Sequence, residues 1–192
     1  MEPAPDEQQV ISRAKQGDKN AVSALYRRYV QAIYRYVSYR VESDAIAEDL
    51  TSEVFLHMVQ GLPHYQQTEA PLGAWLFRIA ANQIADYYRR KRHVTSEPIS
   101  DDRPSDDTDP FGKLEDEEER TQIREALKML PDDYQTLLIL RFMQQLPHSE
   151  VAAIMRKSEA AIRVMQHRAL KALAKAIGSP AKARSYLRGE EA

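Results

Sequence analysis

Apolar residues between positions 130 and 173 recur at helical spacing in three successive segments. The first segment follows Pro131, and its apolar face consists of Tyr134, Leu137, Leu138 and Phe142. Leu146 and Pro147 interrupt the pattern. A short helix follows from about Ser149 to Met155, and its inward positions are Val151, Ala152 and Met155. The last and longest helix is expected to bury Ile162, Met165, Ala169 and Leu173.

Polar and basic side chains occupy the opposite face of this longest helix. Ser158 is expected to cap its first turn by accepting a backbone N–H. The residues that the spacing leaves outside are Ser158, Glu159, Arg163, Gln166, His167, Arg168 and Lys171. A capped helix with such side chains has the shape and the chemistry to enter a DNA major groove. An ordinary helical hairpin with a basic, solvated face gives the same pattern, so this stretch alone leaves both interpretations open.

The N-terminal half shows the same periodicity and predicts four helices. Gly17 ends a short first helix, and Asp18 is expected to cap the second, whose apolar face consists of Val22, Leu25, Tyr29, Ile33 and Tyr36. The third runs from Asp44 to about Gln60, ends at Gly61 and Pro63, and has apolar positions at Ile46, Leu50, Val54 and Met58. A polar loop from His64 to Gly73 precedes a fourth helix, which is expected to bury Leu76, Ile79, Ala80 and Ile84.

The fourth predicted helix ends in a run of basic residues, namely Arg89, Arg90, Lys91, Arg92 and His93. Three aromatic residues of the same helix accompany this run, and they are Trp75, Tyr87 and Tyr88. Aromatic rings beside cations suit single-stranded nucleic acid, because unstacked bases lie on the rings while Arg and Lys hold phosphates. Alternatively, Trp75 belongs to the core and the basic run complements the negative end of the helix dipole. The residues alone do not decide between these interpretations.

Carboxylates dominate the polar face of the third predicted helix, which carries Glu48, Asp49, Ser52 and Glu53. Because His57 is near them, a metal site is one interpretation. Di-iron helical bundles, however, place Glu and His three residues apart and repeat the motif on a second helix. Glu53 and His57 are four residues apart, and the motif has no second copy. We therefore expect no metal and no cofactor, and we favour a solvated face or a surface that docks another protein.

Composition excludes several classes of protein. The chain of 192 residues has room for one medium domain or two small ones, and a hydrophobic content of 43% is ordinary for soluble proteins. No run of about 18 apolar residues is present, so we expect no membrane insertion. Cysteine is absent, which excludes disulfides, thiol catalysis and cysteine-based zinc sites. The first ten residues lack the basic and apolar regions of a signal peptide, so we expect a cytoplasmic protein.

The net charge of −2 is distributed unevenly along the chain. Residues 1–93 are nearly neutral, residues 94–119 carry 2 basic against 11 acidic residues, and residues 120–192 carry 13 basic against 7 acidic ones. The acidic segment also contains three prolines, so it is predicted to be a flexible linker. It is either a solvated spacer or a mimic of nucleic acid that occupies a basic channel in a partner. We predict an all-α fold of two small helical domains, residues 1–93 and 120–178, with a short tail at 179–192.

Taken together, these stretches resemble one family, the extracytoplasmic-function sigma factors, which are small promoter-recognition subunits of bacterial RNA polymerase. GDKNAVSALYRRYVQAIYRYV is similar to the family's opening helix, and AEDLTSEVF resembles its polymerase-binding motif. WLFRIAANQIADYYRRKR is similar to the promoter-melting segment. LP, the predicted helix-turn-helix and HRALKAL resemble the second domain. The motifs occur in the family's order around the acidic segment and cover nearly the whole chain.

The resemblance implies a transcription initiation factor that makes no covalent bond itself. Its polymerase-binding residues, which would dock on the clamp helices of the large polymerase subunit, are Asp49, Ser52, Glu53 and Phe55. Its residues for the −10 element and the melted strand are Tyr65, Gln66, Gln67, Thr68, Trp75, Asn82, Tyr87, Arg89 and Arg90. Its residues for the −35 element are Ser158, Arg163, Val164, His167, Arg168 and Lys171. An anti-sigma protein is expected as a further partner, because it often holds family members inactive.

The chain departs from the family's pattern at several positions. Ser52 stands where Gln is common, Arg156 where the turn usually has Gly, and Ala161 where Thr is common. Arg156 therefore requires a turn that avoids positive φ or tolerates strain. Val164 lies where a hydrogen-bonding residue is frequent, so the −35 sequence is free to differ from familiar ones. Two rival functions are an ordinary helix-turn-helix regulator that works without polymerase and an enzyme with a carboxylate and histidine site.

Overall fold

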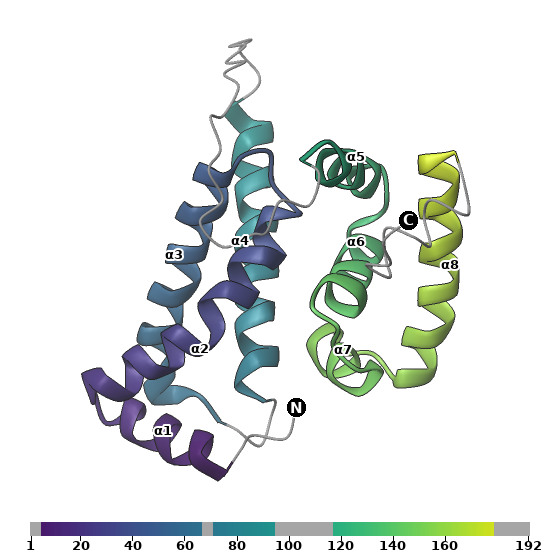
Figure 1. The fold of residues 1–192 in the computed structure, drawn as a ribbon. Helices are drawn as coiled ribbons and strands as arrows, with labels where there is room; N and C mark the ends of the chain where they lie inside the picture. Colours follow the sequence, from purple (N-terminus) through teal and green to yellow (C-terminus); the bar gives the residue numbers. More distant parts are fainter. Residues whose placement is uncertain (1–4, 67–70, 95–116, 179–192) are drawn as a thin grey trace. The chain divides into compact units, whose positions relative to one another are not determined.

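The computed structural model describes residues 5–66, 71–94 and 117–178. These residues form helices joined by turns, with no strand among them, so the all-α prediction is confirmed (Figure 1). The chain divides into two compact units, residues 1–102 and 103–192, which are called the first and the second unit below. Most of the predicted linker and the whole predicted tail lie outside the described residues. None of the described helices is both long enough and apolar enough to cross a membrane.

The first unit is a bundle of helices around one core. It consists of α1 (Pro5–Lys15), α2 (Lys19–Ser38), α3 (Asp44–Gly61), the short 3-10 helix η1 (Leu62–His64) and α4 (Leu72–Val94). α2 packs against α1, α3 and α4, and α3 packs against α4 (Figure 1). Its largest fully buried side chains include most of the predicted apolar faces, with Leu25, Ile33, Tyr36, Met58, Leu76 and Ile84. Three other predicted core residues are only partly buried, namely Val22, Ile46 and Ile79.

Side chains next to the helix ends explain where α2 begins. The Asp18 carboxylate accepts hydrogen bonds from the backbone N–H groups of Asn20 (2.9 Å) and Ala21 (3.3 Å), as the sequence predicts. Gly17 precedes it with φ at +85°, a conformation that glycine adopts without strain. Arg13 also donates a hydrogen bond to Asp18 (2.8 Å), and this contact and the backbone hydrogen bonds lower the pKa of the carboxyl group.

Buried polar contacts attach α1 to the rest of the first unit. Glu7 is only 4% exposed, and its carboxylate accepts a hydrogen bond from Tyr29 Oη (2.6 Å) and pairs with Arg28 Nε (3.2 Å). Burial and the contact with Glu7 raise the pKa of Tyr29, so the phenol stays protonated and can donate. Near the other end of α1, Lys15 Nζ donates to the backbone carbonyl of Tyr65 (2.9 Å). Polar contacts therefore connect α1 both to α2 and to the segment that follows η1.

The second unit contains the predicted helix-turn-helix. Its elements are α5 (Glu117–Lys128), α6 (Asp132–Leu138), the π-helical turn η2 (Ile139–Met143), α7 (His148–Met155) and α8 (Glu159–Ile177). α8 packs against α5, α6 and α7, and its fully buried residues are Ile162, Ala169 and Leu173. Ser158 Oγ accepts a hydrogen bond from the N–H of Ala161 (3.2 Å), so the predicted cap is confirmed. Between α7 and α8, Arg156 adopts the left-handed conformation with φ at 53°, where glycine is usual.

The prediction from spacing is wrong in detail at several positions between Tyr134 and Met165. At η2 the N–H of Gln144 bonds to the carbonyl of Ile139 (3.0 Å), which closes a wider turn than an α-helix has. Four successive residues, Leu137 to Leu140, are completely buried, whereas Tyr134 and Phe142 are only partly buried. In α7, Ile154 is buried and Met155 is partly exposed, and in α8 the predicted core residue Met165 is also only partly buried.

Candidate functional site

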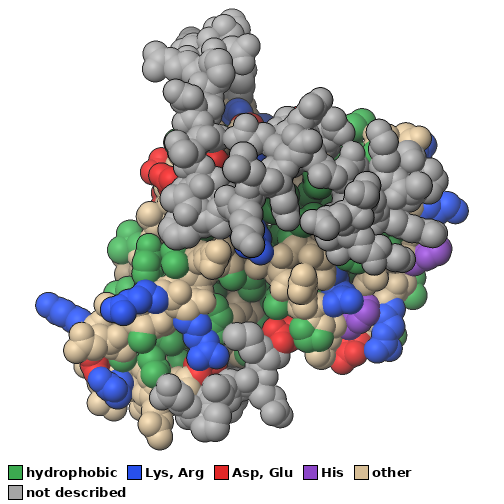
Figure 2. Space-filling model, viewed as in Figure 1, with side chains coloured by type: hydrophobic (Ala, Val, Ile, Leu, Met, Phe, Trp, Pro, Cys, Tyr) green, Lys and Arg blue, Asp and Glu red, His purple; other side chains and the backbone are tan. Residues whose placement is uncertain are grey.

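The exposed face of α8 forms the first candidate site. Its predicted residues lie in solvent at the spacing of one helical face, and they are Arg163, Val164, His167, Arg168 and Lys171. Ser158 is also exposed, although its Oγ is used by the cap. Arg163 Nη2 lies 3.3 Å from the Glu159 carboxylate, an exposed ion pair that holds the guanidinium only weakly. Figure 2 shows basic and histidine side chains on the surface where α7 and α8 meet.

Gln166 does not belong to this face, although the spacing placed it outside. Its Oε1 accepts a hydrogen bond from Arg141 Nε (3.2 Å) and lies 2.9 Å from His148 Nε2. Arg141 also donates from Nη1 to the backbone carbonyl of Leu146. Burial lowers the pKa of Arg141, but a guanidinium remains charged at neutral pH. These contacts connect η2, the start of α7 and α8, so Gln166 orients the helix-turn-helix. Periodicity gave no sign of them, because the partners lie on other helices.

The C-terminal part of α4 forms the second candidate site, and its exposed residues include Asn82, Arg89, Arg90, Lys91 and Arg92. Three of the cations have acidic neighbours, and the pairs are Arg89 with Asp86, Arg90 with Glu53 (3.9 Å) and Lys91 with Glu42 (2.7 Å). Because both partners of each pair are substantially exposed, water screens their attraction. A phosphate group can therefore replace the carboxylates at little cost, which suits a surface that binds a nucleic-acid backbone.

Glu42, which lies between α2 and α3, fixes the residues at this end of α4. Its carboxylate accepts hydrogen bonds from Lys91 Nζ (2.7 Å) and Tyr87 Oη (3.1 Å). Partial burial opposes the ionisation of Glu42, but the hydrogen bond from Lys91 prevails and lowers the pKa of Glu42. The same hydrogen bond raises the pKa of Lys91. Tyr88 Oη donates to the carbonyl of Arg40 (2.6 Å), so both tyrosines are bound to the bundle rather than free in solvent.

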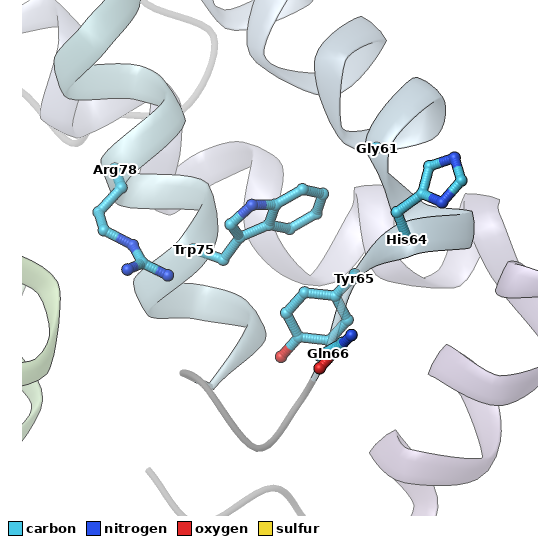
Figure 3. Close-up of a pocket in the computed structure, with 6 residues that line it drawn as sticks. All are labelled: Gly61, His64, Tyr65, Gln66, Trp75 and Arg78. Atoms are coloured by element: carbon cyan, nitrogen blue, oxygen red, sulfur yellow. The ribbon is translucent and has the colours of Figure 1, made fainter.

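A pocket of about 200 Å³ opens between the end of α3 and the first turns of α4 (Figure 3). The residues that line it are Gly61, His64, Tyr65, Gln66, Trp75 and Arg78. The rings of Tyr65 and Trp75 pack together at a tilt, with their centres 5.0 Å apart. Tyr65 is only 6% exposed, and burial raises its pKa to about 12. The indole also lies over Gly61, where a Cβ atom would come within 2.9 Å of Trp75 Cζ2, so glycine is required there.

The pocket brings together three of the residues predicted for the −10 element, namely Tyr65, Gln66 and Trp75. The predicted loop from His64 to Gly73 is shorter in the structure, because η1 includes His64 and α4 already begins at Leu72. Gln67 and Thr68 lie outside the described residues. Gly61, His64 and Arg78 were not predicted, since nothing in the periodicity indicates that the two helix ends meet.

The exposed face of α3 forms the third candidate site. The predicted residues on it are Asp49 and Ser52, which are exposed, and Glu53, which is partly exposed. Phe55 does not belong to this face, because its ring is 6% exposed and packs edge-on against Tyr26, with centres 4.7 Å apart. Leu56 is 57% exposed and lies on the acidic side instead. The sequence spacing already indicates this position, because Leu56 follows Asp49 by seven residues and Glu53 by three and therefore lies on the same side of the helix.

The question of a metal ion concerned Glu53 and His57 on the same helix. His57 is exposed, and the carboxylate of Glu53 lies near Arg90. Within residues 5–66, 71–94 and 117–178, no group of three or more His, Asp or Glu side chains is placed to hold a metal ion.

Two family models match the chain. The model described as Sigma-70 region 2 matches residues 25–94, and the model described as Sigma-70, region 4 matches residues 120–173. The first range contains the pocket, the α3 face and the basic end of α4. The second range contains the helix-turn-helix with the exposed residues of α8.

Two of the similar proteins are described as ECF RNA polymerase sigma factors. The ECF RNA polymerase sigma factor BldN of Streptomyces coelicolor is 33% identical over 177 residues, which cover 91% of this chain and 67% of BldN. The ECF RNA polymerase sigma factor SigD of Mycobacterium tuberculosis is 33% identical over 171 residues, which cover 85% of this chain and 80% of SigD.

Two solved structures share the fold. CnrH, in complex with the cytosolic domain of CnrY, has a TM-score of 0.69 at 19% identity, covering 90% of this chain and 97% of CnrH. The sigma factor RpoE of Bartonella quintana, in complex with the anti-sigma factor NepR, has a TM-score of 0.64 at 20% identity, covering 81% of this chain and 96% of that protein.

Proposed function

Because the chain belongs to the extracytoplasmic-function sigma factors, which direct bacterial RNA polymerase to promoters without a catalytic centre of their own, we propose a division of labour between its two units. The first unit binds core polymerase and the melted −10 element, and the second unit binds the −35 element. The observation that carries this proposal is the continuous exposed face of α8, which presents basic and hydrogen-bonding groups on a capped helix. Since polymerase is a cytoplasmic enzyme, we propose that the chain acts in the cytoplasm.

The second unit reads the −35 element through α8. Arg163 and Arg168 would each contribute about 1–3 kcal/mol of discrimination if they bind guanine with two hydrogen bonds. Arg163→Ala should therefore reduce binding to the chosen −35 sequence more than binding to random DNA. Lys175→Ala is the matched control, because Lys175 is an exposed cation in the last turn of the same helix. Equal losses for both DNAs with Arg163→Ala would contradict sequence readout by this residue.

The first unit docks on the clamp helices of polymerase through the α3 face. Asp49, Ser52 and Glu53 supply its polar part and Leu56 its apolar part, while Phe55 supports the face from inside by packing on Tyr26. Charge reversal at Asp49 and Glu53 should weaken the complex with core polymerase. Gln31→Lys, a change to positive charge at an exposed position of α2, should not. An unchanged affinity of the charge-reversal variant in a titration would remove α3 from the docking surface.

The pocket and the basic end of α4 hold the melted −10 strand. An unstacked base would lie against Trp75 and Tyr65, while Asn82, Arg89 and Arg90 hold the strand that leaves the pocket. Tyr87 supports this surface through its bond to Glu42. Trp75→Ala should impair strand opening more than duplex binding, and Trp75→Phe should retain part of the opening because it keeps a ring. Permanganate footprinting measures the opening, and an unchanged bubble with Trp75→Ala would exclude this role.

Regulation by an anti-sigma protein is part of the proposal. CnrH and the Bartonella protein, which share the fold, are each in complex with a partner, and the latter partner is an anti-sigma factor. Such a protein would block transcription if it covered the α3 face or the exposed face of α8. Its addition to a transcription reaction should therefore suppress the transcript and release the chain from core polymerase.

Run-off transcription with purified core polymerase is the experiment that tests the whole proposal. The chain should bind core polymerase, and the holoenzyme should select a small set of promoters with a −35 and a −10 element from a random library. An ordinary helix-turn-helix regulator would instead bind duplex DNA without polymerase. Failure to bind core polymerase, or binding without any start site, would refute the proposed function.

A further inference from the structure

Val164 is the only large apolar side chain that is exposed in α8, with 54% of its surface in solvent. It does not belong to the core-facing side of α8, which buries Ile162 two residues earlier, on the opposite face of the helix. Nor does helix propensity explain it, because a β-branched residue at an exposed helical position is less favourable than alanine. It lies between Arg163 and His167 on the proposed DNA-binding face, in the N-terminal half of α8.

The major groove offers an exposed apolar side chain one kind of complementary group. Among the base edges there, only thymine carries an apolar substituent, the C5 methyl group, while the other groups are hydrogen-bond donors and acceptors. Burying a valine against these polar groups would gain little and would desolvate them. A valine on a helix that enters this groove is therefore matched to thymine.

The fixed position of Gln166 strengthens this argument. Glutamine reads adenine by accepting from the N6 amino group through Oε1 and donating to N7 through Nε2. Here Oε1 already accepts from Arg141 Nε (3.2 Å) and lies 2.9 Å from His148 Nε2, so that mode is blocked. The other long side chains exposed on this face, Arg163, His167, Arg168 and Lys171, are suited to guanine or to phosphate. An A·T pair is then left to be recognised from its thymine side.

We propose that Val164 contacts the C5 methyl group of a thymine in the −35 element and so makes this chain select an A·T pair at that step. The inference rests on the proposed function and deepens it, since it names the chemical group that this residue reads. Arg163 and Arg168 then read or anchor the neighbouring positions. The −35 sequence selected by this chain contains a thymine whose methyl group is required, next to a guanine or to phosphates held by these arginines.

Deoxyuridine substitution tests the contact, because uracil keeps every hydrogen-bonding group of thymine and lacks only the methyl group. The probe is a promoter duplex isolated from a random library by run-off selection with this chain and core polymerase. Each thymine of its −35 element, on either strand, is replaced in turn by deoxyuridine, and holoenzyme binding is measured. At one position uracil should weaken binding by about three- to fivefold, the effect of losing one buried methyl group.

The variant Val164→Ala shows which residue is responsible for that effect. It should bind the thymine and the uracil duplexes equally at this position, so that the two losses do not add. Lys171→Ala is the matched control, because it weakens binding to every duplex but should keep the three- to fivefold preference for thymine. Val164→Ala retains the fold, since alanine is favourable at an exposed helical position.

Two results would overturn the inference. The first is that replacing thymine by uracil changes the binding of the unsubstituted protein and of Val164→Ala by the same factor at every position. The second is a selected −35 element without any thymine near the arginine contacts. A holoenzyme that transcribes normally from the selected promoter in either case leaves the proposed function standing. If no promoter is selected at all, the proposed function fails and the inference fails with it.

Discussion

Replacing Glu7 with alanine should destabilise the first unit by about 2 kcal/mol. Glu7 is 4% exposed, so its carboxylate is shielded from water, and it accepts a hydrogen bond from the buried Tyr29 Oη at 2.6 Å. A hydrogen bond to a charged group contributes about 1.5–3 kcal/mol, and its removal leaves the phenol without that acceptor. The pairing with Arg28 adds less, because the Arg28 side chain is 36% exposed and water replaces the lost contact.

The single tryptophan provides the assay. Trp75 lies in the pocket of the first unit, so its fluorescence during urea unfolding follows this unit and not the second one. For a domain of this size the urea dependence is about 1–2 kcal/mol per molar, so a loss of about 2 kcal/mol lowers the midpoint by about 1–2 M. Gln8→Ala, at the adjacent exposed position of α1, is the control and should leave the midpoint unchanged.

A double-mutant cycle with Tyr29→Phe isolates the hydrogen bond. If Glu7 acts through the phenol, the two substitutions together should destabilise the unit by at least about 1 kcal/mol less than the sum of the single effects. The ring of Tyr29 remains in Tyr29→Phe, and it lies 3.2 Å from where a Cβ atom of Gly73 would stand. Its packing on the start of α4 is therefore preserved. An unshifted Trp75 transition in Glu7→Ala, or strict additivity in the cycle, would refute the view that this contact secures α1.

Three further predictions concern other parts of the chain. Arg156→Gly should stabilise the second unit by about 0.5–1 kcal/mol, because glycine adopts the left-handed conformation at φ 53° without strain. Slower hydrogen exchange in α7 and α8 would show this stabilisation. Arg156→Ala is the control and should not increase the stability. Glu42→Gln should lower stability slightly near pH 7. The pKa of Glu42 lies below its ordinary 4.5 in the folded chain, so the stabilising effect of its charge is present above pH 4.5 and is lost as the pH falls through the lowered pKa. The free energies of unfolding of the chain and of Glu42→Gln, measured by urea titration, should therefore converge in acid. A difference between them that stays constant with pH would contradict this origin. Leu56→Ala should weaken binding to polymerase, measured by titration, and leave the thermal stability measured by calorimetry unchanged. Phe55→Ala should lower the stability by about 3–5 kcal/mol, because it removes a buried ring. The opposite pattern would make Phe55 the docking residue and Leu56 the structural one.

Local chemistry made much of this fold predictable. Asp18 and Ser158 cap their helices because a short oxygen-bearing side chain before an apolar repeat can accept a backbone N–H, whatever the rest of the chain does. Gly178 ends α8 in the left-handed conformation for an equally local reason. The buried positions of α2 and α4 follow from the same periodicity, because each helix has one face against the core.

Contacts between distant residues were not predictable in the same way. The pocket forms because the end of α3 meets the start of α4, and nothing in the spacing indicates that Tyr65 turns inward against Trp75. Gln166 has the position of a surface residue in its own helix, and only the hydrogen-bonding groups of Arg141 and His148, which come from other elements, make it a contact between helices. Phe55 was named from the resemblance to the family's motif, and a motif of residue types does not show which side chain is buried; the structure buries Phe55 and leaves its neighbour Leu56 exposed.

The π turn at η2 has a consequence for comparing this chain with its relatives. A turn closed between residues five apart holds one more residue than an α-helical turn, so the chain gains a position there without gaining a loop. An alignment with a relative whose helix is regular needs a one-residue gap inside the helix itself. If the gap is moved to the coil before Pro147 instead, each residue from Arg141 to Leu146 is matched with a neighbour about 100° further around the axis. Arg141 would then be equated with a residue that faces elsewhere, and its bond to α8 would look like a peculiarity of one protein.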